Sequence, residues 1–357
     1  MKLSMGNIFL RAALGCSLAL ALASGLRAQQ VEAPDSPAVG QPPQTLGPVA
    51  GVPAAPAAPK EDWGALPVNL ASLQPLSYAI IGTAEHPEYT SELLRIQWRV
   101  ADPIDLYVIK PHGVKNPPVV IYLYGYPNDT SIFRDDGWCK RATQGGLAAV
   151  GFVSALTGQR YASRPMKEWF VSELQESLGT TVHDVQMVLN YLEKRGDLDM
   201  DHVGMFGQGS GGAIAALAAE ADSRISVLDL LNPWGDWPDW LKYSRQVPEK
   251  ERAAYLTPEF LKRVDNLDPV SYLPKLKLKG LRVMQVMDDP VTPPIAMEKI
   301  AAAVPHPEQL VQYKSLAAYR EALASVHSPW MQDQLRPLSP SSGSSQAAAG
   351  GNAAPAP

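Results

Sequence analysis

The chain has 357 residues, of which 46% are hydrophobic and 19% charged, and its 31 basic and 36 acidic side chains give a formal net charge of −5. This length is enough for one large or two small globular domains. The acidic balance excludes the basic stripe that nucleic-acid-binding surfaces need, so we expect no nucleic-acid partner. The 33 prolines are well above the usual share of about 5% of a chain.

The first 28 residues have the pattern of a secretory signal peptide. Lys2 and Arg11 precede an apolar run at 12–26 that is too short to span a bilayer comfortably. Cleavage after Ala23 and cleavage after Ala28 both fit the sequence. We therefore predict an exported protein, periplasmic or extracellular, with no stable membrane span after cleavage.

Two cysteines bear on this prediction. Cys16 lies inside the apolar run, so a lipoprotein anchor is a less favoured alternative to cleavage. Removal of the signal leaves Cys139 as the single cysteine. No intrachain disulfide can then form, and the exported domain must depend on its hydrophobic core.

Composition divides the rest of the chain into three parts. Residues 29–60 hold eight prolines among Ala, Gly, Gln and Val, a composition that cannot bury enough surface to fold, and we expect a disordered linker. Residues 336–357 hold four more prolines with Ser, Gly and Ala, and we expect a disordered tail. A single domain at 61–335 remains, with no internal repeat.

Within this domain, short apolar runs alternate with amphipathic segments, which indicates an α/β fold: a mostly parallel twisted sheet with helices on both faces. Residues 181–194 and 213–221 are the clearest helices. Residues 231–275 lie between two strands and predict a small helical cap insertion. The predicted strands are 106–109, 119–124, 148–155, 203–206, 225–230 and 281–286, with a weaker one at 310–313.

The run VGMFGQGSGGAIA at 203–215 predicts a strand, a glycine-rich turn and a helix start. It resembles the nucleophile elbow of the α/β-hydrolase superfamily, G-x-S-x-G, in which a strained turn lifts the nucleophile above the sheet. Residues 118–127 (PVVIYLYGYP) resemble the strand and turn that supply one oxyanion-hole amide, with Tyr124 where the family often has His. The resemblance covers about residues 95–315, is closest to the dienelactone-hydrolase and oligopeptidase-like branch, and implies an esterase or peptidase.

The elbow departs from the family at its nucleophile. Aligned without gaps, the nucleophile position falls on Gly209, which has no atom that can attack a carbonyl. A shift by one residue makes Ser210 the nucleophile but replaces a close-packing glycine by Gln208. The glycine pattern favours the first alignment, and Ser210 is also a residue type favoured at helix starts.

The resemblance suggests the other active-site residues. The strand at 283–294 (VMQVMDDPVTPP) is similar to the one that presents the triad acid and assigns that role to Asp289, which turn chemistry also explains. The family's histidine should follow the last strand, but 314–319 contains none. His327, 38 residues after Asp289, is the only later histidine and would be the base, or a plain helix-end residue.

An active enzyme would thus use Ser210, Asp289 and His327, with the amides of Tyr126 and Gly211 holding the oxyanion. The rest of the predicted pocket is aromatic. Tyr124, Trp234 and Trp237 are the predicted pocket residues for a small ester or peptide-like ligand. For the tryptophans we favour packing of the insertion, and an aromatic wall for the ligand is the alternative. A fold that has lost its chemistry and serves in ligand or partner binding is the alternative.

A different class of function fits the same glycines. Residues 207–212 satisfy G-x-G-x-x-G between a strand and a helix, and Asp229, 20 residues after Gly209, lies where a dinucleotide-binding fold would hold the ribose. The flanking strands and export favour the hydrolase hypothesis. We expect no metal and no cofactor, because the sequence has no HExxH and no CxxC. Cys139 is a weaker candidate nucleophile, since a buried thiol is the commoner case.

Overall fold

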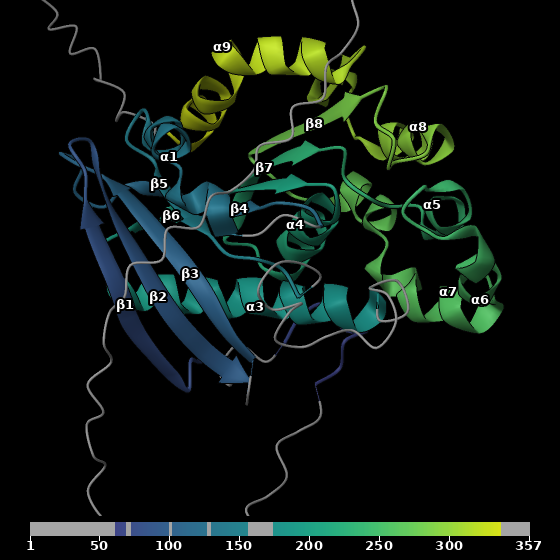
Figure 1. The fold of residues 1–357 in the computed structure, drawn as a ribbon, viewed down its shortest axis with the longest axis horizontal. Coiled ribbons are helices and arrows are strands. Elements are labelled where there is room, and N and C mark those ends of the chain that lie inside the picture. Colours follow the sequence, from purple (N-terminus) through teal and green to yellow (C-terminus); the bar gives the residue numbers. More distant parts are fainter. Residues whose placement is uncertain (1–60, 69–72, 100–101, 127–129, 156–173, 337–357) are drawn as a thin grey trace, which may run out of the picture. The chain divides into compact units, whose positions relative to one another are not determined.

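The computed structural model describes residues 61–68, 73–99, 102–126, 130–155 and 174–336, and in 323–329 the backbone only. The predicted signal peptide, linker and most of the predicted tail lie outside the described residues. Nine strands of the described part form one sheet in the order β1-β2-β3-β5-β4-β6-β7-β8-β9 (Figure 1). They are β1 (Ser77–Glu85), β2 (Tyr89–Arg99), β3 (Asp102–Pro111), β4 (Pro118–Leu123), β5 (Ala148–Gly151), β6 (Asp199–Gln208), β7 (Ile225–Leu231), β8 (Gly280–Val286) and β9 (Leu310–Tyr313).

The sheet is mostly parallel, which confirms the predicted fold class. Strands β5, β4, β6, β7, β8 and β9 pair in parallel, and β1, β2 and β3 pair antiparallel and join the rest through β5. The parallel strands are apolar over most of their length because helices cover both of their faces. The carboxyl ends of β4, β6, β7 and β8 therefore meet at one edge, where open α/β sheets carry their sites.

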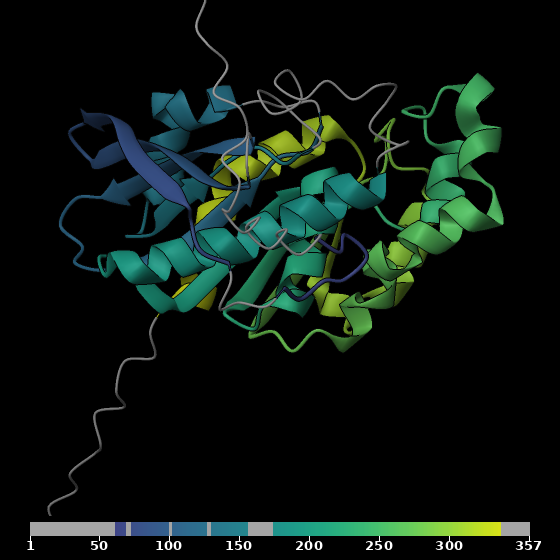
Figure 2. The ribbon, with the colours of Figure 1, turned by 90° about the horizontal axis from the view of Figure 1, so that it is seen from below.

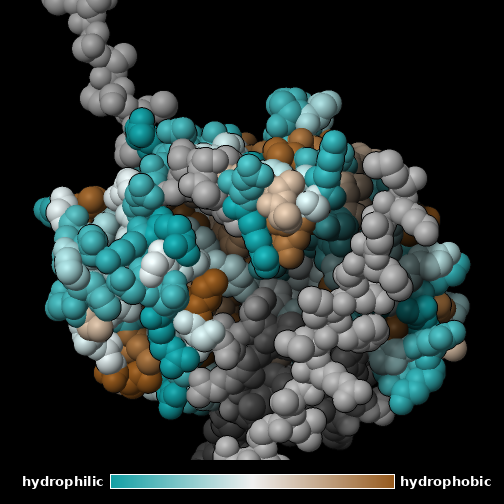
Figure 3. All heavy atoms as spheres, turned by 45° about the horizontal axis from the view of Figure 1, so that its top comes forward, coloured by the Kyte–Doolittle hydropathy of each residue, from teal (hydrophilic) through white to brown (hydrophobic). Residues whose placement is uncertain are grey.

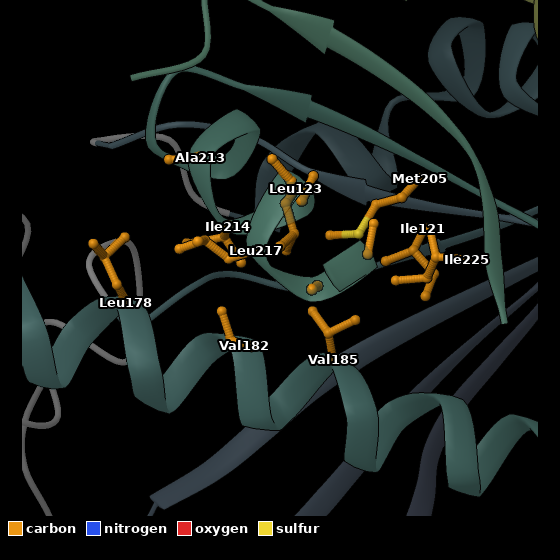
Figure 4. Close-up of a cluster of buried hydrophobic side chains, with 14 of the residues drawn as sticks. Ile121, Leu123, Leu178, Val182, Val185, Met205, Ala213, Ile214, Leu217 and Ile225 are labelled. Atoms are coloured by element: carbon orange, nitrogen blue, oxygen red, sulfur yellow. The ribbon is translucent and has the colours of Figure 1, made fainter. Parts of the chain in front are cut away.

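Helices lie on both faces of the sheet (Figures 1 and 2). On one face, α3 (Leu174–Arg195) and α4 (Ser210–Ala221) pack against each other and the strands. In Figure 4, Leu178, Val182 and Val185 of α3 point toward Ile214 and Leu217 of α4. The opposite face carries α1 (Asp136–Thr143) and α9 (Leu316–Leu335), which pack on two separate apolar clusters.

The segment that precedes β1 is bound along α3. A Cβ on Gly179 would lie 2.3 Å from the carbonyl oxygen of Trp63, so only glycine admits this approach. One turn further, the ring nitrogens of His183 contact Glu61 Oε1 at 2.5 Å and the carbonyl oxygen of Ala65 at 2.8 Å. His183 thus attaches the segment that precedes β1 to α3.

Between β7 and β8 the chain forms short helices. They are α5 (Trp237–Tyr243), η2 (Glu249–Glu251), α6 (Arg252–Tyr255), α7 (Pro258–Val264), η3 (Asp265–Leu267), η4 (Pro269–Ser271) and η5 (Leu273–Lys275). In this region α5 packs against α8 (Pro294–Ala303), which follows β8. The remaining short helices of the described part are η1 (Thr130–Arg134) and η6 (Pro307–Gln309).

The hairpin of β1 and β2 is absent from the sequence-based prediction. All nine residues of β1 are exposed, so its apolar side chains do not form the buried run that marks a strand.

On the face drawn in Figure 3, hydrophilic side chains predominate among the coloured residues, and hydrophobic ones form small separate groups. No helix in the described ranges combines the length and the hydropathy that crossing a membrane requires.

Candidate functional site

The glycine-rich run forms a sharp turn between β6 and α4. Strand β6 ends at Gln208, Gly209 has φ of 57° and ψ of −120°, and α4 begins at Ser210. This conformation is costly for a residue with a Cβ atom. The Gly209 N–H donates to the carbonyl oxygen of Leu231 at 2.9 Å, and its own carbonyl accepts from the Trp234 N–H at 3.0 Å. The end of β7 therefore fixes the turn from the side.

Two flanking glycines allow close backbone contacts around this turn. A Cβ on Gly207 would lie 2.5 Å from the carbonyl oxygen of Gly211, and a Cβ on Gly211 would lie 2.2 Å from that of Leu123. Real Cβ atoms do not approach backbone atoms this closely, so both positions require glycine. The residue that lies midway between these two close-packing glycines is Gly209, at the apex of the turn.

Ser210 is fully buried in the first turn of α4. Its hydroxyl oxygen accepts a hydrogen bond of 3.0 Å from the backbone N–H of Tyr126. Tyr126 follows the end of β4 and is the residue whose amide we predicted for the oxyanion hole. The structure thus brings two predicted site residues together, but it directs that amide toward the Ser210 hydroxyl.

The predicted aromatic wall is a buried cluster. Trp234, Trp237 and Trp240 are each at most 3% exposed, and the rings of Trp234 and Trp240 lie 4.6 Å apart. The Trp237 indole N–H donates to the carbonyl oxygen of Leu267 at 2.8 Å. A Cβ on Gly209 would lie 3.2 Å from Trp234 Nε1, so this indole borders the space above the turn.

Tyr124 lies on the opposite face of the sheet from the tryptophans, in the apolar cluster against which α1 packs. Its hydroxyl accepts a hydrogen bond of 2.7 Å from the Trp138 indole N–H, and burial raises its pKa. The neighbouring Cys139 is 1% exposed, its thiol donates to the carbonyl oxygen of Phe133, and burial raises its pKa as well. A buried thiol with a raised pKa is a poor nucleophile.

Asp289 lies in the turn after β8. Its carboxylate accepts hydrogen bonds from the backbone N–H groups of Val291 and Thr292, at 3.3 and 3.0 Å. His327 belongs to α9, and its side chain is outside the described part of the structure. The chain between β9 and α9 contains Lys314 and Ser315, and Ser315 caps the helix.

The side chains of His202 and His112 bind residues outside the predicted site. His202 contacts Asp199 at 2.7 Å, and His112 contacts the hydroxyl of Thr90 at 3.1 Å. His306 precedes the short helix η6. Among the side chains that the structure describes, no histidine hydrogen-bonds to Ser210 or Asp289.

Asp229, the acid of the dinucleotide alternative, forms a buried ion pair. Its two carboxylate oxygens accept from Arg282 Nε at 2.9 Å and from Nη2 at 2.6 Å, and both residues are at most 5% exposed. The pair joins the neighbouring strands β7 and β8, in which the two residues lie opposite each other. No group of three or more His, Cys, Asp or Glu side chains in the described ranges is arranged to hold a metal ion.

Sequence reasoning missed Asp236, which lies two residues after Trp234. Its backbone is left-handed, with φ of 55°, and its side chain is 9% exposed. Burial raises its pKa to about 6, against the opposing effect of Lys299, whose ammonium lies 3.0 Å from Asp236 Oδ1. Lys299 also contacts Asp239 at 2.5 Å. These partners come from α5 and α8, far apart in the sequence, so no local motif signals the cluster.

Comparison with known proteins gives structural matches alone. No protein-family model and no curated protein matches the sequence. Acetyl xylan esterase 1 from Thermoanaerobacterium sp. JW/SL YS485 is similar with a TM-score of 0.58 and 14% identity, over 73% of this chain and 88% of the esterase. An acetyl xylan esterase from Paenibacillus sp. R4 has the same TM-score and 16% identity, over 74% and 90% of the two chains. An S-formylglutathione hydrolase from Agrobacterium tumefaciens matches with a TM-score of 0.52 and 15% identity, over 72% and 99%.

Proposed function

Because the chain has the α/β-hydrolase fold, we propose that it is an exported, serine-hydrolase-like protein in which the elbow has lost its nucleophile. The observation that carries this proposal is the conformation of Gly209. It occupies the apex of the strand-turn-helix element, midway between the close-packing Gly207 and Gly211. A hydrogen atom stands there in place of a side chain, and acyl transfer at this position has no attacking atom.

Ser210 is the rival nucleophile, and its surroundings argue against that role. Its hydroxyl is buried and accepts a hydrogen bond from the Tyr126 amide. A nucleophilic serine must give its proton to a base, and the described side chains include no histidine bonded to it. The Tyr126 amide would also have to leave Ser210 before it could stabilise an oxyanion.

The acid and the base of the predicted triad are supported no better. The Asp289 carboxylate accepts from two backbone amides, as a turn-forming aspartate does, and contacts no histidine of the described part. The loop from β9 to α9, where the family's base is expected, offers Lys314 and Ser315. We therefore assign Asp289 a structural role in the turn before α8.

What remains is a binding function. The solved structures that this chain resembles include acetyl xylan esterases and an S-formylglutathione hydrolase. We assign the chain a small ester or peptide-like ligand, or a partner protein. The dinucleotide hypothesis has less support, since the Asp229 carboxylate is held by Arg282 rather than free for a ribose.

Ester turnover tests this proposal. Purified wild-type protein, Ser210→Ala and Asp289→Asn are incubated with p-nitrophenyl acetate, and nitrophenolate release is compared with that of heat-denatured protein. We expect all three to release nitrophenolate at the background rate. A wild-type rate clearly above background that disappears in Ser210→Ala would overturn the proposal and identify Ser210 as the nucleophile.

A further inference from the structure

The free edge of the sheet carries a group of exposed apolar side chains. Strand β1 is the outermost strand of the sheet (Figure 1), and all nine of its residues are exposed. Leu76, Tyr78, Ile80 and Ile81 are 70%, 61%, 56% and 49% exposed. Monomeric proteins seldom leave so many adjacent large apolar side chains in water, and such patches mark interaction sites.

This apolar edge continues the core of the domain. In the pairing with β2, Tyr78 lies opposite Ile96 and Ile80 opposite Leu94, two fully buried core residues. The Tyr78 ring also contacts the ring of Tyr191 on α3, with centroids 5.1 Å apart. Tyr78 and Ile80 therefore extend the face that α3 covers, at the place where this face reaches the sheet edge.

Strand β1 lacks most of the features that protect an edge strand from pairing. Its sequence, SYAIIGTAE, contains no Lys and no Pro, and Glu85 at its end is its single charged residue. One protective feature is present, a bulge between Ile80 and Gly82. The free N–H and C=O groups of the outer side are therefore available to another strand.

We propose that β1 is the dimer interface of this protein, and that two copies pair antiparallel along β1 about a twofold axis perpendicular to the sheet. Tyr78 and Ile80 lie before the bulge, on the face of the sheet that α3 covers. The twofold axis places the Tyr78 and Ile80 side chains of both copies on this same face of the joined sheet, where they can pack across the interface. Each copy brings Glu85 as the single charged residue of its β1 strand.

The chain's own terminal segments are poor alternatives as the partner strand. Between Pro34 and Pro59 no more than four consecutive residues are free of proline, which interrupts strand pairing because proline lacks the N–H donor. The tail at 341–354 consists mainly of Ser, Gly and Ala, which have low strand propensity. A second copy supplies a strand of matching length with Tyr and Ile.

The test is the mass of the full chain in solution, measured by light scattering over a concentration series. The wild type is compared with Tyr78→Lys/Ile80→Lys, and with Tyr78→Thr/Ile80→Thr, which keeps strand propensity in case the lysines disturb the hairpin. Ile295→Lys is the matched control, since Ile295 is 40% exposed but lies on α8. Hydrogen exchange of the β1 amides reports whether the strand itself is paired.

We expect the wild type and Ile295→Lys to have twice the monomer mass, with protected β1 amides. Both double variants should be monomers with fast-exchanging β1 amides. A wild type that stays monomeric at every concentration overturns the proposal, including when it binds a different protein. A dimer that persists in the Thr double variant, or that forms with β1 amides unprotected, overturns it equally.

Discussion

At the scale of one residue, the proposed loss of the nucleophile rests on Gly209. Its φ of 57° is a conformation in which any side chain costs free energy, and the Trp234 indole borders the space that a side chain would enter. An enzyme of this fold accepts that cost in order to expose its nucleophile. With glycine the turn keeps its geometry, and the cost is avoided.

Gly209→Ala is therefore expected to destabilise the protein through two effects, the left-handed backbone and the contact with Trp234. Gly196→Ala is the matched control, because Gly196 has φ of 72° and open space around it. We expect a loss of about 1 kcal/mol for Gly196→Ala and of about 2–3 kcal/mol for Gly209→Ala. Urea unfolding measures both, and equal losses would mean that Trp234 moves aside without cost.

The contacts of single residues were the least predictable part of the site. The apex at Gly209 follows from the spacing of its flanking glycines, which the sequence displays. The hydrogen bond from Tyr126 to Ser210 depends on how closely the end of β4 approaches α4, and the two residues are 84 positions apart. No local pattern carries that information.

At the scale of elements, burial determined which strands could be predicted from the sequence. Strands β3 to β8 lie in the sheet's covered part and appear as apolar runs, whereas β1 is exposed along its whole length. Strand β2 has intermediate burial at most positions, so its pattern is weak too. The antiparallel hairpin was therefore missed, although the helices on both faces were predicted.

The Asp229–Arg282 pair links two of the predicted strands, and its removal should be costly. Arg282→Met removes the guanidinium that faces the buried Asp229 carboxylate, and we expect a loss of about 3–5 kcal/mol. Lys140→Met breaks an ion pair of solvent-exposed groups with Asp136 and should cost much less stability, because water screens such a pair. Denaturant unfolding measures both losses.

The double variant Asp229→Asn/Arg282→Met provides the control for the charge itself. Because it also removes the charge of the buried carboxylate, it should recover much of the stability that Arg282→Met loses. A double variant as unstable as the single one would show that Arg282 acts through packing, for example through its contact with the Trp330 ring at 4.5 Å.

At the scale of the whole molecule, Asp236 makes stability depend on pH. Burial raises its pKa from 3.8 to about 6, so between these values the folded protein binds more protons than the unfolded chain. Stability from this group is present at low pH and decreases as the pH rises through about 6. Asp236→Asn removes the dependence, and asparagine tolerates the left-handed backbone.

Thermal unfolding of both proteins between pH 4 and pH 7 measures this effect. The variant should gain stability relative to the wild type as the pH rises, by an amount on the order of 1 kcal/mol. The two profiles would stay parallel if the Asp236 carboxylate were not penalised by burial.

The architecture as a whole was the most predictable feature. The alternation of apolar runs with amphipathic segments gave the α/β class, and the motif at 203–215 gave the α/β-hydrolase fold that the solved structures share. Both signals come from many residues, so single departures such as Gly209 do not remove them. Function depends on a few atoms, and the same departures decide it.

The most direct measurement of the central claim is intact-mass spectrometry of the wild-type protein after treatment with a fluorophosphonate, which forms a covalent adduct with activated serines. The mass should be unchanged. Gly209 has no side-chain atom that could attack the reagent, and none of the described histidine side chains hydrogen-bonds to Ser210. Trypsin treated in parallel confirms that the reagent is active. An adduct that maps to Ser210 and is absent from Ser210→Ala would contradict the claim and make this protein an active serine hydrolase.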